Sequence, residues 1–88
     1  MEKFKPLDVI ANTRPIPIDR LTLVDPAYEC IQRLPSGQVG TIVSIHEPNS
    51  SSPQYLIEFA DLQGREYAMA TLKAEEILAI HFELSTSI

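Results

Sequence analysis

The sequence predicts an all-β domain, a small closed barrel of about five strands, and two observations predict it. Short β-rich segments recur at intervals of roughly ten residues, with turn signals between them, which is typical of a small sandwich or barrel. Two of the chain's three glycines, Gly37 and Gly40, come just before a β-rich run. Glycine tolerates the bends and bulges that a small closed sheet requires, so we expect Gly37 to turn the chain and Gly40 to bend the strand.

The length predicts a single domain. A chain of 88 residues holds one hydrophobic core, because two smaller cores would each leave most of their surface exposed. Hydrophobic residues make up 44% and charged residues 22%, as in ordinary globular proteins and unlike disordered chains. We expect residues 1–88 to form one domain with frayed ends at 1–5 and 85–88.

The net charge and the cysteine content limit the expected partners and the expected cellular location. The net charge of −5 repels a phosphate backbone, and the basic residues are scattered, so nucleic acid is an unlikely partner. The single cysteine, Cys30, cannot form an internal disulfide, which favours a reducing, cytoplasmic location. No apolar run approaches the roughly 20 residues of a membrane-spanning helix.

The first predicted strand covers residues 7–11, an apolar segment bounded by Pro6 and Asn12. A long connection follows from Asn12 to Ser36, and its prolines at 15, 17, 26 and 35 exclude a central strand or a long helix. We therefore expect a long loop with local structure.

Two interpretations compete within this loop. Asp25 followed by Pro26, with apolar residues at helical spacing up to Leu34, predicts one or two helical turns. Alternatively, residues 21–24 pair with residues 29–32 across a turn at residues 25–28, since proline favours the second turn position.

The middle of the chain predicts a strand and a hairpin. Residues 41–46 are β-rich, and because a strand rather than a helix follows Gly40, a phosphate-binding glycine loop is not indicated. The polar, proline-containing residues 47–53 predict an exposed loop. Residues 55–59, with Tyr55 on the apolar face, and residues 65–72 form a hairpin around the turn residues 61–64.

The last segment predicts a helical turn and a closing strand. Residues 73–76 favour the turn by residue type, and the apolar run 77–82 predicts a strand that closes the barrel. A single helix over residues 72–82 is the alternative.

No group of residues predicts catalysis, a metal site or a cofactor. His46 and His81 are isolated in the sequence, and we interpret both as surface or strand-end residues. The adjacent Glu75 and Glu76 are interpreted as solvated surface on a turn. Cys30 is three residues from Arg33, which would suit a reactive thiol on a helical turn, although an inert, partly buried cysteine is the commoner case. We expect no enzyme activity and no cofactor.

Several segments resemble a known family. They are residues 8–11, Leu34 with the run 37–43 (GQVGTIV), residues 55–59 with Asp61 and Gly64, and residues 67–72 with Ile77 and Leu78. Together they resemble a small bacterial, often cyanobacterial, SH3-like barrel family, domain-of-unknown-function family 4926, from Leu7 to about His81. The run 37–43 is also similar to the KOW motif of ribosomal and transcription-factor barrels.

This resemblance implies an SH3-like barrel and no established activity. The segment from Asn12 to Leu34 takes the place of the long first loop of such a barrel, and it is longer and richer in proline than is usual for the family. We therefore expect function to vary in this loop.

We expect a non-enzymatic protein-interaction module or accessory subunit, because a long ordered loop in a compact domain is usually functional. The expected contact residues are Arg14, Ile16, Arg20, Tyr28 and Arg33. A KOW-like nucleic-acid binder, with the loop arginines on one face, is one alternative. A small acidic inhibitor or antitoxin-like protein, complementary to a basic target, is another.

The apolar run 77–82, with Leu84 beyond it, allows two outcomes. Burial as the closing strand is the favoured one, and the protein is then a monomer. An unprotected edge strand would instead pair with a second copy in a weak homodimer.

Overall fold

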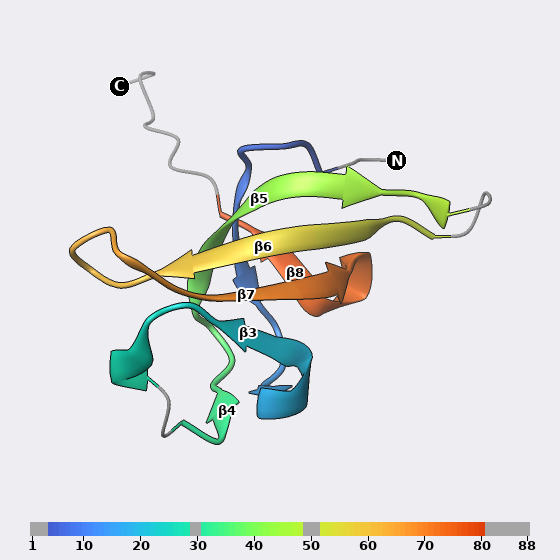
Figure 1. Cartoon of the computed structure of the whole chain (residues 1–88). Helices are drawn as coiled ribbons and strands as arrows, with labels where there is room; N and C mark the ends of the chain where they lie inside the picture. Colours follow the sequence, from blue (N-terminus) through green and yellow to red (C-terminus); the bar gives the residue numbers. More distant parts are fainter. Residues whose placement is uncertain (1–3, 29–30, 49–51, 81–88) are drawn as a thin grey trace, which may run out of the picture.

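The computed structural model describes residues 4–28, 31–48 and 52–80 and shows an all-β protein (Figure 1). Its strands are β1 (Val9–Asn12), β2 (Ile16–Pro17), β3 (Leu21–Leu23), β4 (Arg33–Leu34), β5 (Val39–His46), β6 (Gln54–Ala60), β7 (Glu66–Lys73) and β8 (Ile77–Ala79). Short 3-10 turns η1 (Ile18–Arg20), η2 (Pro26–Tyr28) and η4 (Ala74–Glu76) lie between them.

Five antiparallel strands form the predicted barrel. They lie in the order β7-β6-β5-β1-β8, with β3 added outside β7, and β2 and β4 form a separate two-stranded sheet. Strand β5 pairs with β1 through its first residues and with β6 along its length. A bulge between Ile42 and Ser44 increases the local bend. The strand order, the long first loop and the 3-10 turn before the last strand are those of a small SH3-like barrel.

Gly37 turns the chain before β5, as predicted, whereas Gly40 is the second residue of β5 and permits the close approach of β6; the irregularity of the strand lies further on, between Ile42 and Ser44. Gly37 has φ +83° and open space around it, so it supplies a turn that other residues adopt at a cost. Gly40 lies between Ile10 of β1 and Phe59 of β6. A Cβ at Gly40 would lie 2.6 Å from Ile57 Cγ2 and 2.9 Å from the Glu58 carbonyl oxygen, so close strand approach requires glycine here.

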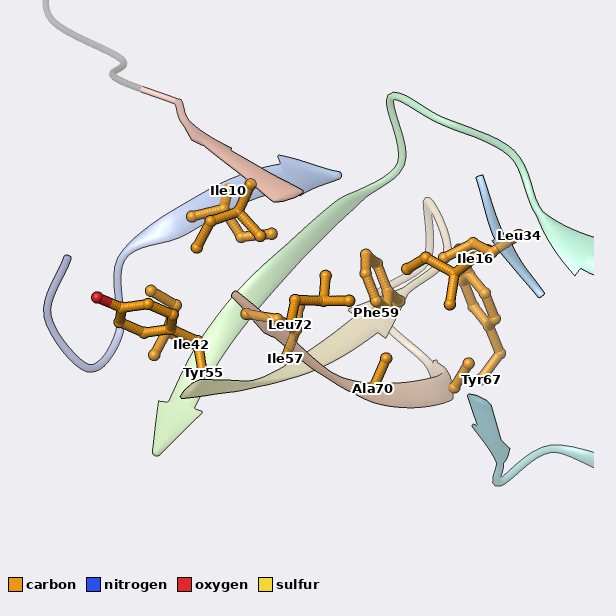
Figure 2. Close-up of a cluster of buried hydrophobic side chains, with 12 residues drawn as sticks. Ile10, Ile16, Leu34, Ile42, Tyr55, Ile57, Phe59, Tyr67, Ala70 and Leu72 are labelled. Atoms are coloured by element: carbon orange, nitrogen blue, oxygen red, sulfur yellow. The ribbon is translucent and has the colours of Figure 1, made fainter. Parts of the chain in front are cut away.

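The core runs along the inside of the barrel (Figure 2). Its largest fully buried side chains are Phe59, Ile10, Ile42, Ile57 and Leu72. The alternation predicted for residues 55–59 is confirmed, since Tyr55, Ile57 and Phe59 are all at most 4% exposed. Figure 2 shows Tyr67, Ile16 and Leu34 at the end of this cluster that lies under the long loop.

The first strand begins later than the sequence predicts. Leu7 has φ +77° and occupies a turn closed by the Asp8 N–H donating to the Lys5 carbonyl at 3.1 Å. Pro6 fixes the second position of that turn, so the strand starts only at Val9.

The described residues 25–28 and 31–34 contain the 3-10 turn η2 and the short strand β4 (Arg33–Leu34), which pairs with β2. Strand β3 pairs with β7, from Leu21 opposite Ala70 to Leu23 opposite Ala68, and residues 31 and 32 are not part of a strand, so the second interpretation, a hairpin of residues 21–24 with residues 29–32, is wrong. Strand β3 pairs with the edge of β7 because this pairing places Leu21 and Leu23 against the core.

The hairpin, the helical turn and the closing strand are confirmed as β6, β7, η4 and β8. Strand β8 pairs with β1, so the helix alternative for residues 72–82 is wrong. Ile77 is buried whereas Leu78 is 60% exposed, so one face of β8 packs against the core and the other face is exposed.

Candidate functional site

A groove of about 440 Å³ lies between the long loop and the hairpin that joins β6 to β7. In Figure 1 this hairpin and η2 lie on the same side of the molecule. The lining comes from the loop and the start of β5 (Tyr28, Ile31, Arg33, Leu34, Pro35, Gly37, Gln38 and Val39) and from the hairpin and β7 (Ala60, Asp61, Leu62 and Tyr67). Most of these residues are apolar or aromatic, as in sites that take up side chains of a ligand.

A stacked tyrosine pair lies in the groove. The rings of Tyr28 and Tyr67 have centroids 4.7 Å apart and planes inclined by 27°. Tyr67 is 7% exposed, and this burial, with smaller contributions from Tyr28 and Asp61, raises the pKa of its hydroxyl. Tyr28 is half-buried, so its ring links the core to the surface of the groove.

The η2 turn holds Tyr28 in place. The Asp25 carbonyl accepts the Tyr28 N–H at 2.9 Å, and the Asp25 carboxylate accepts the Ala27 N–H at 3.0 Å. Pro26 fixes its own φ and has no N–H to satisfy. The turn that the sequence predicts from Asp25 and Pro26 is thus the element that presents the aromatic side chain.

Asp61 places a fixed negative charge at the groove. Its Oδ1 accepts the backbone N–H groups of Gln63 at 3.0 Å and Arg65 at 2.9 Å. The hydrogen bond from Arg65 is the largest of the influences that lower the pKa of Asp61, and the Tyr28 hydroxyl adds to them. The same bonds close the hairpin turn and leave Leu62 at its tip fully exposed, at 102%.

Asn12 fastens the base of the long loop, a role that no pattern around this residue indicates. It is 2% exposed, and its Nδ2 donates to the carbonyls of Arg14 at 2.8 Å and Pro35 at 3.0 Å. Its Oδ1 accepts the Gln38 N–H at 2.7 Å. The carboxamide is thus satisfied by three backbone groups from both ends of the loop.

Arg20 and Glu76 fasten the middle of the loop to η4. Their charged atoms approach to 2.8 Å and 3.1 Å, and Arg20 also donates to the Thr71 carbonyl at 3.1 Å. The hydrogen bond from Arg20 lowers the pKa of Glu76 to about 2. The interpretation of Glu76 as solvated surface is therefore wrong: its side chain is 14% exposed, because Arg20 covers it.

The structure divides the predicted contact residues among four places. Tyr28 and Arg33 line the groove. Arg20 is engaged with Glu76, and Arg14 is exposed beside the base of the loop. Ile16 is 2% exposed and packs in the core, which corrects its assignment as a contact, because β2 pairs with β4 and turns this side chain inward.

The residues on the hairpin side of the groove were not predicted from the sequence. Asp61 and Leu62 read as turn residues and Tyr67 as part of a strand, and no local pattern indicates that they face η2. His46 lies exposed at the end of β5, as predicted. Cys30 and His81 lie outside the described residues.

Among residues 4–28, 31–48 and 52–80, no three His, Cys, Asp or Glu side chains form a cluster that could hold a metal ion. In this described part of the chain, no helix has the length and apolar character needed to cross a membrane.

The geometry defines a small SH3-like barrel with a groove beside its long first loop. Residues 7–79 match the family described as Domain of unknown function (DUF4926), and the chain belongs to this family. No curated protein and no solved structure matches the chain significantly.

Proposed function

We propose that this protein is a non-enzymatic protein-interaction module or accessory subunit whose groove binds a short, extended, mainly apolar segment of another protein. The observation that carries the proposal is the groove of about 440 Å³ with the Tyr28–Tyr67 pair in it. This volume lies at the low end for ligand pockets, so it suits a few side chains of a segment. Tyrosine offers a large contact area at little cost in conformational entropy.

The anchoring of the loop supports this proposal. Binding is more favourable when the groove is already ordered, because no free energy is then spent on ordering the receptor loop. Asn12 and Glu76 hold this loop at its base and at its middle. Arg20 is already engaged with Glu76, so it would have to leave its carboxylate to reach a phosphate. This favours a protein partner over nucleic acid. The proposed setting is a bacterial cytoplasm, in keeping with the single cysteine.

The test is affinity capture from the source cells with chemical cross-linking and mass spectrometry. Tyr28→Ala and Leu62→Lys each change one side of the groove, whereas Ile18→Ala removes an exposed apolar side chain of the same loop (38% exposed) outside it. We expect both groove variants to lose a partner that the wild type and Ile18→Ala retain, with cross-links next to the groove. Equal capture by all four proteins would overturn the groove assignment.

Two further measurements separate the alternatives. Binding of DNA or RNA oligonucleotides at low salt that weakens steeply with added salt would point to nucleic acid. A captured basic enzyme that the protein inhibits would point to an inhibitor.

A further inference from the structure

Asp61 gives the mainly apolar groove a negative charge. Its side chain is only 15% exposed, yet it lines the groove together with Tyr28 and Leu62. Its Oδ1 accepts the backbone N–H groups of Arg65 and Gln63 at 2.9 Å and 3.0 Å. These hydrogen bonds, above all the one from Arg65, lower the pKa of Asp61, so the carboxylate is ionised at neutral pH. The hairpin turn therefore holds a charge at a fixed position in the groove.

This carboxylate retains room for a further hydrogen bond. An ionised carboxylate accepts about four hydrogen bonds, and the two backbone N–H groups and the Tyr28 hydroxyl account for three of them. The Arg65 Nε lies 3.7 Å from Oδ2, which is beyond hydrogen-bonding distance. The Arg65 side chain is also 71% exposed, so water weakens its pairing with Asp61. Because Oδ1 is engaged by the turn, Oδ2 is the oxygen left for a donor that enters the groove.

Arg33, on the loop side of the groove, carries a positive charge and would favour the opposite kind of ligand. It is exposed whereas Leu34 beside it is buried, so the Arg33 side chain points away from the core and water screens its charge. The charge of the less exposed Asp61 is screened less. The net charge of −5 acts in the same direction, since it attracts a cation and repels an anion. Charge complementarity therefore favours a basic group in the ligand.

Tyr28 offers a surface for the rest of a basic side chain. Its ring stacks on the buried Tyr67 with centroids 4.7 Å apart, and it is itself half-buried, so part of the ring remains accessible from the groove. Aromatic rings attract cations, and lysine and arginine pack their aliphatic stems along apolar surfaces while the charged end reaches a polar partner. A basic side chain thus suits both the apolar lining and the carboxylate.

We propose that the segment bound in the groove carries a lysine or arginine that binds Asp61 Oδ2 and packs its aliphatic stem against Tyr28. This inference rests on the proposed function and adds the chemical class of the partner segment, which combines apolar residues with a basic one. Asp61 then selects the charge of the ligand, whereas Val39 and Leu62, both exposed in the groove lining, provide apolar contacts.

The first test is selection of short peptides from a random displayed library on the wild type, Asp61→Asn and Glu66→Gln. Asparagine keeps a side-chain oxygen for the N–H groups of the turn and removes only the charge. Glu66→Gln removes the same charge from an exposed residue of β7 outside the groove lining. We expect the wild type and Glu66→Gln to select apolar peptides with a lysine or arginine at a constant position. Asp61→Asn should select apolar peptides without this preference.

The second test measures the affinity of one selected peptide by fluorescence anisotropy, together with an analogue that has norleucine in place of the basic residue. Norleucine keeps an aliphatic stem and lacks the charge. The exchange should weaken binding to the wild type at least about tenfold and binding to Asp61→Asn less than about twofold. If Asp61→Asn fails to fold, amide shifts of the wild type replace it, and the exchange should alter the shifts of residues 61–65 and leave that of Arg33 unchanged.

The outcomes distinguish this inference from the proposed function. Selection of acidic peptides, or an equal loss of affinity in the wild type and Asp61→Asn, would overturn the inference. Apolar peptides that bind without a basic residue, and that Tyr28→Ala no longer binds, would overturn it and leave the proposed function intact. Failure to select any peptide whose binding depends on Tyr28 would overturn both.

Discussion

The carboxamide oxygen of Asn12 accepts the backbone N–H of Gln38 at 2.7 Å, across 26 residues of chain. The Asn12 carbonyl also accepts the Gly37 N–H at 2.7 Å. The two ends of the long loop are therefore joined through one buried residue, and the groove depends on that junction because Gly37 and Gln38 line it.

Replacing Asn12 should lower the free energy of unfolding by more than the size of this side chain suggests. Asn12→Asp keeps the acceptor for Gln38 but loses both donors, and places a buried carboxylate against the carbonyls of Arg14 and Pro35. We expect a loss of about 2–4 kcal/mol in the free energy of unfolding, measured by urea denaturation at pH 7. The exposed Thr13→Val is the control and should cost under about 1 kcal/mol. A similar small loss in both variants would contradict the role of Asn12.

The ion pair between Arg20 and Glu76 predicts a pH dependence. The pKa of Glu76 is lowered to about 2 in the folded protein against an unfolded value near 4.5, so its ionised form stabilises the fold. This stabilisation is complete above about pH 5 and is lost as the pH falls from 4.5 towards 2. Because the Arg20 side chain is 42% exposed, we expect a contribution of about 1–2 kcal/mol, discounted for solvent screening.

Denaturant melts between pH 2 and pH 7 measure this effect. Glu76→Gln should be less stable than the wild type at pH 7 and should converge with it near pH 2. Its exposed neighbour Glu75→Gln removes the same formal charge without touching Arg20 and should keep the wild-type slope. Parallel pH curves for the wild type and Glu76→Gln would refute the pair's contribution.

Gly37, which precedes β5, and Gly40, which lies within it, should respond differently to replacement by alanine. Gly40→Ala places a methyl group 2.9 Å from a backbone oxygen of β6, so the strands must separate, at a cost of about 2–3 kcal/mol. In Gly37→Ala the added methyl group lies in open space, so only the positive φ of this residue is unfavourable, and the free energy of unfolding should fall by about 1 kcal/mol. Thermal unfolding by circular dichroism should rank the wild type above Gly37→Ala and Gly37→Ala above Gly40→Ala; the reverse order would be inconsistent with the packing at Gly40.

Leu7 offers a stabilising substitution. It is 78% exposed and occupies the third position of a turn at φ +77°, a region that asparagine and glycine adopt more readily. Leu7→Asn should raise the free energy of unfolding by about 0.5–1 kcal/mol. Leu7→Ala removes the side chain but keeps the unfavourable backbone, so it should change stability little. If Leu7→Asn is no more stable than Leu7→Ala, the turn imposes no strain.

Local patterns in the sequence were enough to predict the barrel. The β-branched run after Gly40, the apolar alternation at Tyr55, Ile57 and Phe59, and the turn at Asp61 and Gly64 each act within a few residues, and all were confirmed. Leu7 was misplaced because an apolar residue beside a strand reads as part of it, although Pro6 had already started a turn.

Most of the candidate site depends on contacts between distant residues. Arg20 and Glu76 are 56 residues apart, and nothing near either of them indicates the other. Strand β3 joins β7 instead of its neighbour in sequence, and Tyr28 meets Tyr67 only because of that pairing. Such contacts follow from the folded sheet, so a single sequence without its structure could not identify the hairpin side of the groove.

The junction at Asn12 also makes the barrel a natural scaffold for engineering. Since the two ends of the loop meet within hydrogen-bonding distance, the exposed positions between them can be varied without moving the strands that carry the loop, provided that Ile16, Leu34 and β3 are kept in place. Libraries restricted to those exposed positions would then display new binding sequences on an unchanged frame.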